Sequence, residues 1–173
     1  MCGLFYRVRG VYGLACGGVV VRLFRGNDVP DIGRLVVELE RECSVFGAGA
    51  LALFIGFVKG VVDGKRVMYL EYEAYESVAV EVLRRIGLSV LEKYDGVKSV
   101  HIYHRVGRAK PGELALAVLV VGVSRKEAME ALREVVERVK HEPPIYKLEV
   151  REDGRFWVLG DGVRIAGKRV ENG

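Results

Sequence analysis

The segment LALAVLVVGV at residues 114–123 constrains the fold more than any other part of the chain, because it is apolar on both faces. Strands covered on both faces have this composition, whereas half-exposed strands alternate apolar and polar residues. A membrane-spanning helix needs roughly 20 apolar residues, and both this run and the apolar run at 47–58 are shorter. We therefore expect a soluble protein in which residues 114–123 form an inner strand of a sheet.

Three pairs of turn residues predict antiparallel hairpins around this strand. Asp-Gly at 63–64 lies between two apolar segments and suits a type I′ turn, whose two central residues both have positive φ. Pro-Gly at 111–112 connects residues 97–107 to the inner strand, and Asp-Gly at 153–154 turns the last hairpin. Alternation in the strand after the first turn predicts that Met68 faces the core.

Three other segments predict helices. A turn at 27–31, in which Pro30 and Asp31 suit a helix start, leads into a short helix that ends near Cys43. Residues 77–94 carry one apolar stripe at helical spacing. Ser124 begins an S-x-x-E capping box, and the helix that follows must end near Glu142, which precedes a proline. Together the blocks predict one α+β domain with two long helices packed on its sheet.

The three cysteines, Cys2, Cys16 and Cys43, lack CxxC spacing. An odd number without that spacing fits neither a zinc site nor a disulfide framework, so the simple inference is a reducing cytoplasm. The apolar start of the chain around Cys16 also resembles a secretory signal or a lipid-modified cysteine. Four glycines interrupt this segment, which favours a poorly ordered extension or a small hairpin over residues 1–18.

Composition and net charge limit the classes of binding partner but do not identify one. The chain lacks glutamine and threonine and is rich in valine, arginine and glutamate, a bias that suggests a heat-adapted host. A net charge of +4 favours an anionic partner, which can be a nucleic acid, a phosphorylated metabolite or an acidic protein. The sequence contains no GxxxxGK loop, dinucleotide fingerprint, HExxH or GxSxG motif.

The histidines have ordinary structural explanations. His104 alternates with apolar residues on the expected buried face of its strand, which favours a hydrogen-bonded core histidine over a catalytic one. His101 faces the other way. His141 lies at a helix end, where a cation complements the helix dipole.

The stretch KHEPPIYKLE at 140–149 holds the most informative charges. Lys140 lies in the last turn of a helix, where a cation complements the dipole without any further role. The two prolines fix an extended path, so Lys147 leaves at a defined angle to Lys140, and both ammonium groups can point into one cleft. Such a pair lowers the pKa of each lysine and attracts an anion. Glu149 lies on the same strand face as Lys147, where it can hold that lysine or share its proton.

Four segments, in this order, resemble the catalytic large subunit of molybdopterin synthase: GALALFIGFVKG, LEYEAYE, HRVG followed by PGELALAV, and KHEPPIYKLE. The resemblance implies an α/β-hammerhead fold at residues 19–159, and it leaves 160–173 as a basic C-terminal tail. It also implies sulfur transfer from the thiocarboxylated C-terminal Gly-Gly of a small ubiquitin-like subunit to cyclic pyranopterin monophosphate. The product is the dithiolene of the molybdenum or tungsten cofactor.

The same resemblance implies a homodimer of large subunits in which each protomer receives one small subunit, giving a heterotetramer. The large subunit is expected to be active only in that complex, in the cytoplasm, without a cofactor, a metal, nucleic acid or a membrane. Eight site residues transfer by motif: Phe57, Val58, Lys59, Ser124, Arg125, Lys140, Lys147 and Glu149.

Each residue type has a chemical reason to be there. Lys59 and Arg125 are cations for the cyclic phosphate, and Arg125 lies near free N–H groups at a helix start. Lys147 is expected to protonate the departing oxygens, and Lys140 to steady the thiocarboxylate by its chemistry or its position. The family usually has arginine in place of Lys59 and histidine in place of Ser124.

Two other functions stay open. A basic nucleic-acid-binding protein would explain the charge, although the aromatic residues lie within strand patterns rather than between arginines and lysines. A family member that kept its binding surfaces but lost activity would explain Ser124.

Overall fold

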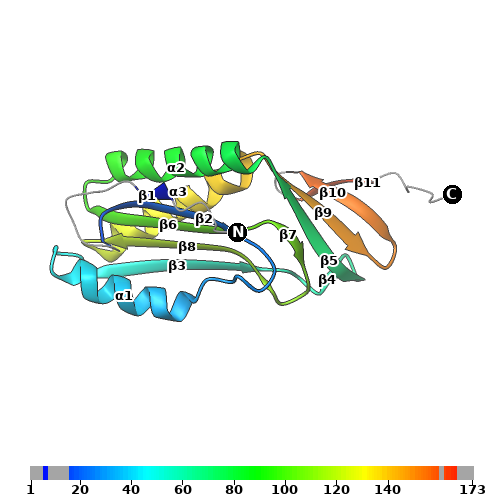
Figure 1. Ribbon diagram of the computed structural model, residues 1–173, viewed down its shortest axis with the longest axis horizontal. Helices are drawn as coiled ribbons and strands as arrows, with labels where there is room; N and C mark the ends of the chain where they lie inside the picture. Colours follow the sequence, from blue (N-terminus) through cyan, green and yellow to red (C-terminus); the bar gives the residue numbers. More distant parts are fainter. Residues whose placement is uncertain (1–5, 8–15, 160–161, 167–173) are drawn as a thin grey trace.

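The computed structural model describes residues 6–7, 16–159 and 162–166, which form two sheets and three helices (Figure 1). The first sheet has five strands in the order β1-β2-β6-β8-β3. Their bounds are Tyr6–Arg7 for β1, Gly18–Phe24 for β2, Val97–Arg105 for β6, Leu114–Gly122 for β8 and Ala50–Phe57 for β3.

The second sheet adjoins one end of the first (Figure 1) and has the order β11-β10-β9-β5-β4, with β7 paired to β5. These strands run over Val163–Ala166 for β11, Gly154–Leu159 for β10, Ile145–Arg151 for β9, Lys65–Ala74 for β5, Val61–Val62 for β4 and Gly107–Ala109 for β7. The chain boundary predicted at residue 160 therefore falls between two paired strands, because β11 pairs with β10.

The inner strand is where its composition predicts. β8 lies between β6 and β3 and is antiparallel to both, and its residues from Ala115 to Gly122 are buried. The pairing of β2 with β6 is parallel, which the turn signals do not predict. A parallel pair has no turn of its own to reveal it, because its strands are joined by a long crossover.

Three helices cover the first sheet: α1 at Ile32–Ser44, α2 at Glu76–Lys93 and α3 at Arg125–His141. The apolar stripes of α2 and α3 pack with one face of the sheet in a single core, whereas Leu39 and Cys43 of α1 belong to a separate core with residues of β2, β6 and β8. The predicted caps are confirmed, since Asp31 accepts from Arg34 N and Ser124 from Glu127 N. None of the described helices is long and apolar enough to span a membrane.

Arg105 lies where the two sheets meet, and its Nη1 donates to the carbonyl of Arg108 in β7 at 3.4 Å. Its side chain is 2% exposed, and its Nε donates to the Leu114 carbonyl at 2.6 Å. The guanidinium lies over the Phe24 ring, 5.2 Å from its centroid, and pairs with Glu113 at 3.5 Å. This buried cation therefore fixes the point where the chain leaves β6 for β7 and then returns to β8.

Met68 does not face the core, because β5 contains an irregularity. The pairing register of β5 with β9 shifts between Val67 and Tyr69. Val67 is 3% exposed and occupies the core, while Met68 is 45% exposed. One extra residue in a strand reverses the alternation on one side of it, so the prediction for Met68 was wrong.

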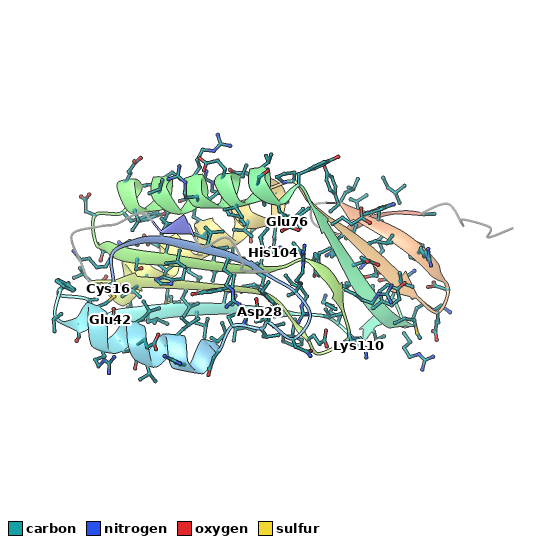
Figure 2. All side chains as sticks on the ribbon, viewed as in Figure 1. Cys16, Asp28, Glu42, Glu76, His104 and Lys110 are labelled. Atoms are coloured by element: carbon teal, nitrogen blue, oxygen red, sulfur yellow. A yellow bond between two sulfur atoms is a disulfide. The ribbon has the colours of Figure 1, made fainter. Side chains whose placement is uncertain are left out.

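The inference that the cysteines form no disulfide was also wrong. Cys16 and Cys43 are joined by a disulfide, with a Cα–Cα distance of 5.0 Å. Both are fully buried, at the start of β2 and the end of α1, and Figure 2 shows Cys16 close to Glu42, the neighbour of Cys43. The two positions are brought together by the packing of α1 on the sheet, for which the sequence has no spacing signature.

We predict that reducing this disulfide lowers the free energy of unfolding by roughly 3 kcal/mol, because the bond closes a loop of intermediate length. Urea unfolding with and without reductant measures the loss, and a Cys16→Ala/Cys43→Ala variant should not respond to reductant. Thiol titration of the unreduced, denatured chain should detect only Cys2. Three reactive thiols under these conditions would contradict the pairing.

Candidate active site

A cavity of about 610 Å³ lies where the two sheets meet. Its walls come from the ends of β3 and β6, the start of β8, part of β5, the last turn of α3, and strands β9 to β11. Elements that are far apart in the sequence therefore enclose one space, and five charged side chains line it: Lys59, Lys140, Lys147, Glu149 and Arg164.

Pro143 and Pro144 form a corner between α3 and β9, called the proline corner below, and this corner brings Lys140 and Lys147 to the cavity. Lys140 is in the last turn of α3, and Lys147 is in β9 between Tyr72 of β5 and Val158 of β10. The Pro144 carbonyl accepts from the backbone N–H of Tyr75, just before α2, at 3.3 Å. The corner is thereby tied to the fold at the point where β9 begins.

Lys147 is half-buried among other charges. Burial lowers its pKa, the Glu149 carboxylate partly opposes this, and the cations Arg164, Lys59 and Lys140 lower the pKa further. A desolvated ammonium next to other cations loses its proton more readily than one in water. The segment 140–149 predicts only Lys140 as a neighbouring cation, whereas the fold supplies three.

Glu149 is on the same face as Lys147 but is bound to another residue. Its carboxylate accepts from Arg164 Nε at 2.8 Å and from Arg164 Nη2 at 3.4 Å. Arg151 adds a second guanidinium at 3.7 Å. No local sequence pattern indicates Arg164, because it lies in the predicted tail and reaches the cavity only through the pairing of β11 with β10.

The other predicted residues divide into two groups. Phe57 and Lys59 line the cavity, while Val58 between them is 2% exposed and packs in the small core of the second sheet. Ser124 and Arg125 are at the far end of α3, a helix about 25 Å long, and do not line the cavity. Within one chain, the fold does not bring these two residues to Lys147.

His104 is a buried, hydrogen-bonded histidine, as its pattern predicts, and it is also part of the cavity wall. Its Nδ1 donates to the Arg105 carbonyl at 2.8 Å, and the ring lies edge-on to Tyr72 at 5.5 Å between centroids. Burial lowers its pKa to about 4, and the nearby Lys147 contributes in the same direction. The imidazole is therefore neutral near pH 7, with Nε2 as an acceptor.

This arrangement suits an anionic ligand that needs a proton donor. Three lysines and one arginine line the cavity, and the single carboxylate among these charges is already bound to arginine. An excess of cations in a partly desolvated space attracts phosphate and carboxylate groups strongly. Among the described residues, no group of His, Cys, Asp and Glu side chains could hold a metal ion.

Comparison with known proteins gives one family. Residues 30–142 match the model of the MoaE protein family, a range that ends before Lys147. A molybdopterin synthase catalytic subunit from Bacillus subtilis (strain 168) is 45% identical over 111 residues, which are 64% of this chain and 70% of that protein.

Solved structures agree with this match. The crystal structure of molybdopterin synthase from Staphylococcus aureus is 37% identical and has a TM-score of 0.61, covering 64% of this chain and 80% of that one. A complex of subunits 1 and 2 of the molybdopterin-converting factor from Helicobacter pylori 26695 shares the fold at 21% identity. Its TM-score is 0.63, and it covers 87% of this chain and 91% of that one.

We predict that His104 stays neutral down to about pH 4. The unfolded chain then binds this proton more strongly than the folded chain, so His104 makes the fold less stable as the pH falls from about 6.5 to about 4. The total loss is roughly 3 kcal/mol. Urea unfolding at pH 7 and pH 4.5 should show a larger loss for the wild type than for His104→Gln. An NMR titration midpoint of the imidazole near 6.5 would contradict this.

Proposed function

The chain belongs to the MoaE protein family, and from this premise we propose that it is the catalytic subunit of a molybdopterin synthase. In this reaction, sulfur passes from the thiocarboxylated C-terminus of a small ubiquitin-like subunit to cyclic pyranopterin monophosphate, and the dithiolene forms. The observation that carries the proposal is the cavity that holds Lys59, Lys140 and Lys147 together.

Lys147 is the proposed general acid. Sulfur transfer displaces oxygen from the substrate, and each departing oxygen needs a proton. An acid works best when its pKa is close to the working pH, and burial together with three neighbouring cations moves Lys147 in that direction. Its position on an inner strand of the second sheet holds the ammonium group in place during the reaction.

Lys59 and Lys140 are the proposed anion-binding groups. Lys140 is 44% exposed and pairs only loosely with Glu137, at 3.6 Å, so it can turn toward an incoming thiocarboxylate. Lys59 is proposed to bind the phosphate of the substrate as a point charge, without the bidentate hydrogen bonds that an arginine can make. Phe57 is 64% exposed at the same rim and offers an apolar surface to the arriving chain end.

We propose that a second copy of the chain supplies Ser124 and Arg125. These residues are at the end of α3 remote from Lys140, so a phosphate in this cavity can meet them only if they come from another protomer. A homodimer that binds one small subunit per protomer then makes a heterotetramer with two sites. The α/β-hammerhead description and a single domain that begins near residue 19 belong to the same proposal, and β11 with Arg164 extends this domain beyond residue 159.

A heat-adapted host and a cytoplasmic location are also proposed. The composition supports the first, and the buried disulfide is compatible with both, because intracellular proteins of hyperthermophiles are rich in disulfides.

We predict that the purified chain alone converts no substrate, and that dithiolene appears when the thiocarboxylated small subunit and precursor are added. Lys147→Ala should lower the rate of transfer at least 100-fold, the usual contribution of a general acid. Lys65→Ala, which removes an exposed lysine outside the cavity, is the matched control. Turnover without the small subunit, or full activity of Lys147→Ala, would refute the proposal.

The dimer is tested by complementation. Lys147→Ala and Arg125→Ala chains should each be inactive as pure dimers. A mixture should recover about a quarter of the wild-type activity, because half of the dimers are mixed and one of their two sites is intact. A mixture that stays inactive would show that each site is built from one chain.

A further inference from the structure

Arg164 reaches the cavity from the edge strand β11 and binds Glu149 with two N–H groups. The distances are 2.8 Å from Nε to Oε1 and 3.4 Å from Nη2 to Oε2. Glu149 is 4% exposed, so this carboxylate is held in a partly dry site, where such pairs are strongest. Arg164 lies outside the family match, which ends at residue 142.

Groups that can titrate or carry charge face Lys147 from every element around it. They are Glu149 and Tyr146 on its own strand, Arg164 on β11, Lys140 and His141 on α3, Lys59 after β3, His104 on β6 and Tyr72 on β5. Glu149 is the single anion in this set. Whether Lys147 is free or paired therefore depends on where this one carboxylate points.

We propose that Arg164 is a positioning residue for the sulfur transfer described above, because it holds Glu149 away from Lys147 and keeps the ammonium free for substrate. The role in sulfur transfer rests on the proposed function, whereas the effect of Arg164 on the titration of Lys147 can be measured on this chain alone. Lys147 forms no ion pair among the described residues, although Glu149 is two positions away on the same face.

Arginine is the better competitor for this carboxylate. Its planar fork matches both oxygens at once, while a lysine offers one point charge. Asp63, at the turn between β4 and β5, contacts Arg164 at 3.8 Å and Arg151 at 3.3 Å, so both guanidinium groups are held in place. The network therefore keeps Glu149 on the arginine side of the cavity.

If Glu149 were released from Arg164, Lys147 would become a weaker acid. A carboxylate that pairs with Lys147 stabilises the ammonium form and raises the pKa of the lysine. The rate would then be lower on its plateau, because a weaker acid protonates the departing oxygen more slowly. The basic limb of the pH–rate profile would move to higher pH.

The experiment follows the titration of Lys147 directly. The rate of acetylation of Lys147 by a small amine-reactive reagent is measured against pH by mass spectrometry, on the full chain without its partner. Arg164→Gln should raise the midpoint by roughly one pH unit. Arg155→Gln removes an exposed arginine of the same sheet that has no ion pair among the described residues, and should leave the midpoint unchanged.

Two further variants separate the release of Glu149 from the loss of a positive charge. Arg164→Lys keeps the charge and retains the packing of β11 but loses the two-pronged grip, so it should also raise the midpoint. In a Glu149→Gln background, Arg164→Gln should shift the midpoint less than half as far. An unchanged midpoint in Arg164→Lys, or equal shifts in both backgrounds, would overturn the proposal.

The pH–rate profile of the complete complex adds the functional readout. With the thiocarboxylated partner present, the basic limb for Arg164→Gln should move upward by the same amount as the acetylation midpoint. If the midpoint moves and wild-type complex transfers no sulfur, the proposed function fails and the electrostatic role of Arg164 stands. If sulfur is transferred and the limb does not move, the positioning role fails.

Discussion

The half-buried ammonium group of Lys147 is the constraint on which the rest of the site depends. A charge removed from water is costly unless an opposite charge compensates it, yet the one carboxylate nearby is bound by Arg164 and Arg151. The cavity therefore carries excess positive charge that a bound anion would neutralise. The same excess positive charge would therefore favour binding of an anionic substrate and make Lys147 a stronger acid.

Two features of the backbone hold this charge in place. The proline corner turns the chain from α3 into β9, so that the last turn of a helix and an inner strand face one space. Arg105 donates to backbone carbonyls on both sides of the junction, Leu114 in β8 and Arg108 in β7, next to His104 in the opposite wall of the cavity. Neither sheet alone would enclose the cavity, because each supplies only part of its wall.

Local signals in the sequence predict most of the secondary structure. The inner strand, both side-chain helix caps and the turn at 63–64 follow from composition and spacing, because each depends on residues close together in the chain. Met68 shows the limit of such reasoning, since an irregularity in β5 depends on its neighbour β9. The parallel pairing of β2 with β6 and the disulfide also depend on distant segments.

The residues of the site also differ in whether a local pattern predicts them or only contacts between distant segments bring them together. Lys140, Lys147 and Glu149 were found together because one short segment contains them, and the effect of the prolines is local. Arg164 was missed because only the pairing of β11 with β10 brings it to the cavity. His104 was recognised as a core residue, but its place in the cavity wall depends on how the second sheet meets the first.

The most direct test of this account is a crystal structure of the chain in complex with the small subunit, with its C-terminal glycine bound. If the cavity is the site of sulfur transfer, the terminal carboxylate carbon lies in it between the two sheets, within about 4 Å of the Nζ atom of Lys140 or Lys147, as in an ion pair. A chain end bound elsewhere, with both lysines facing only solvent, would contradict it.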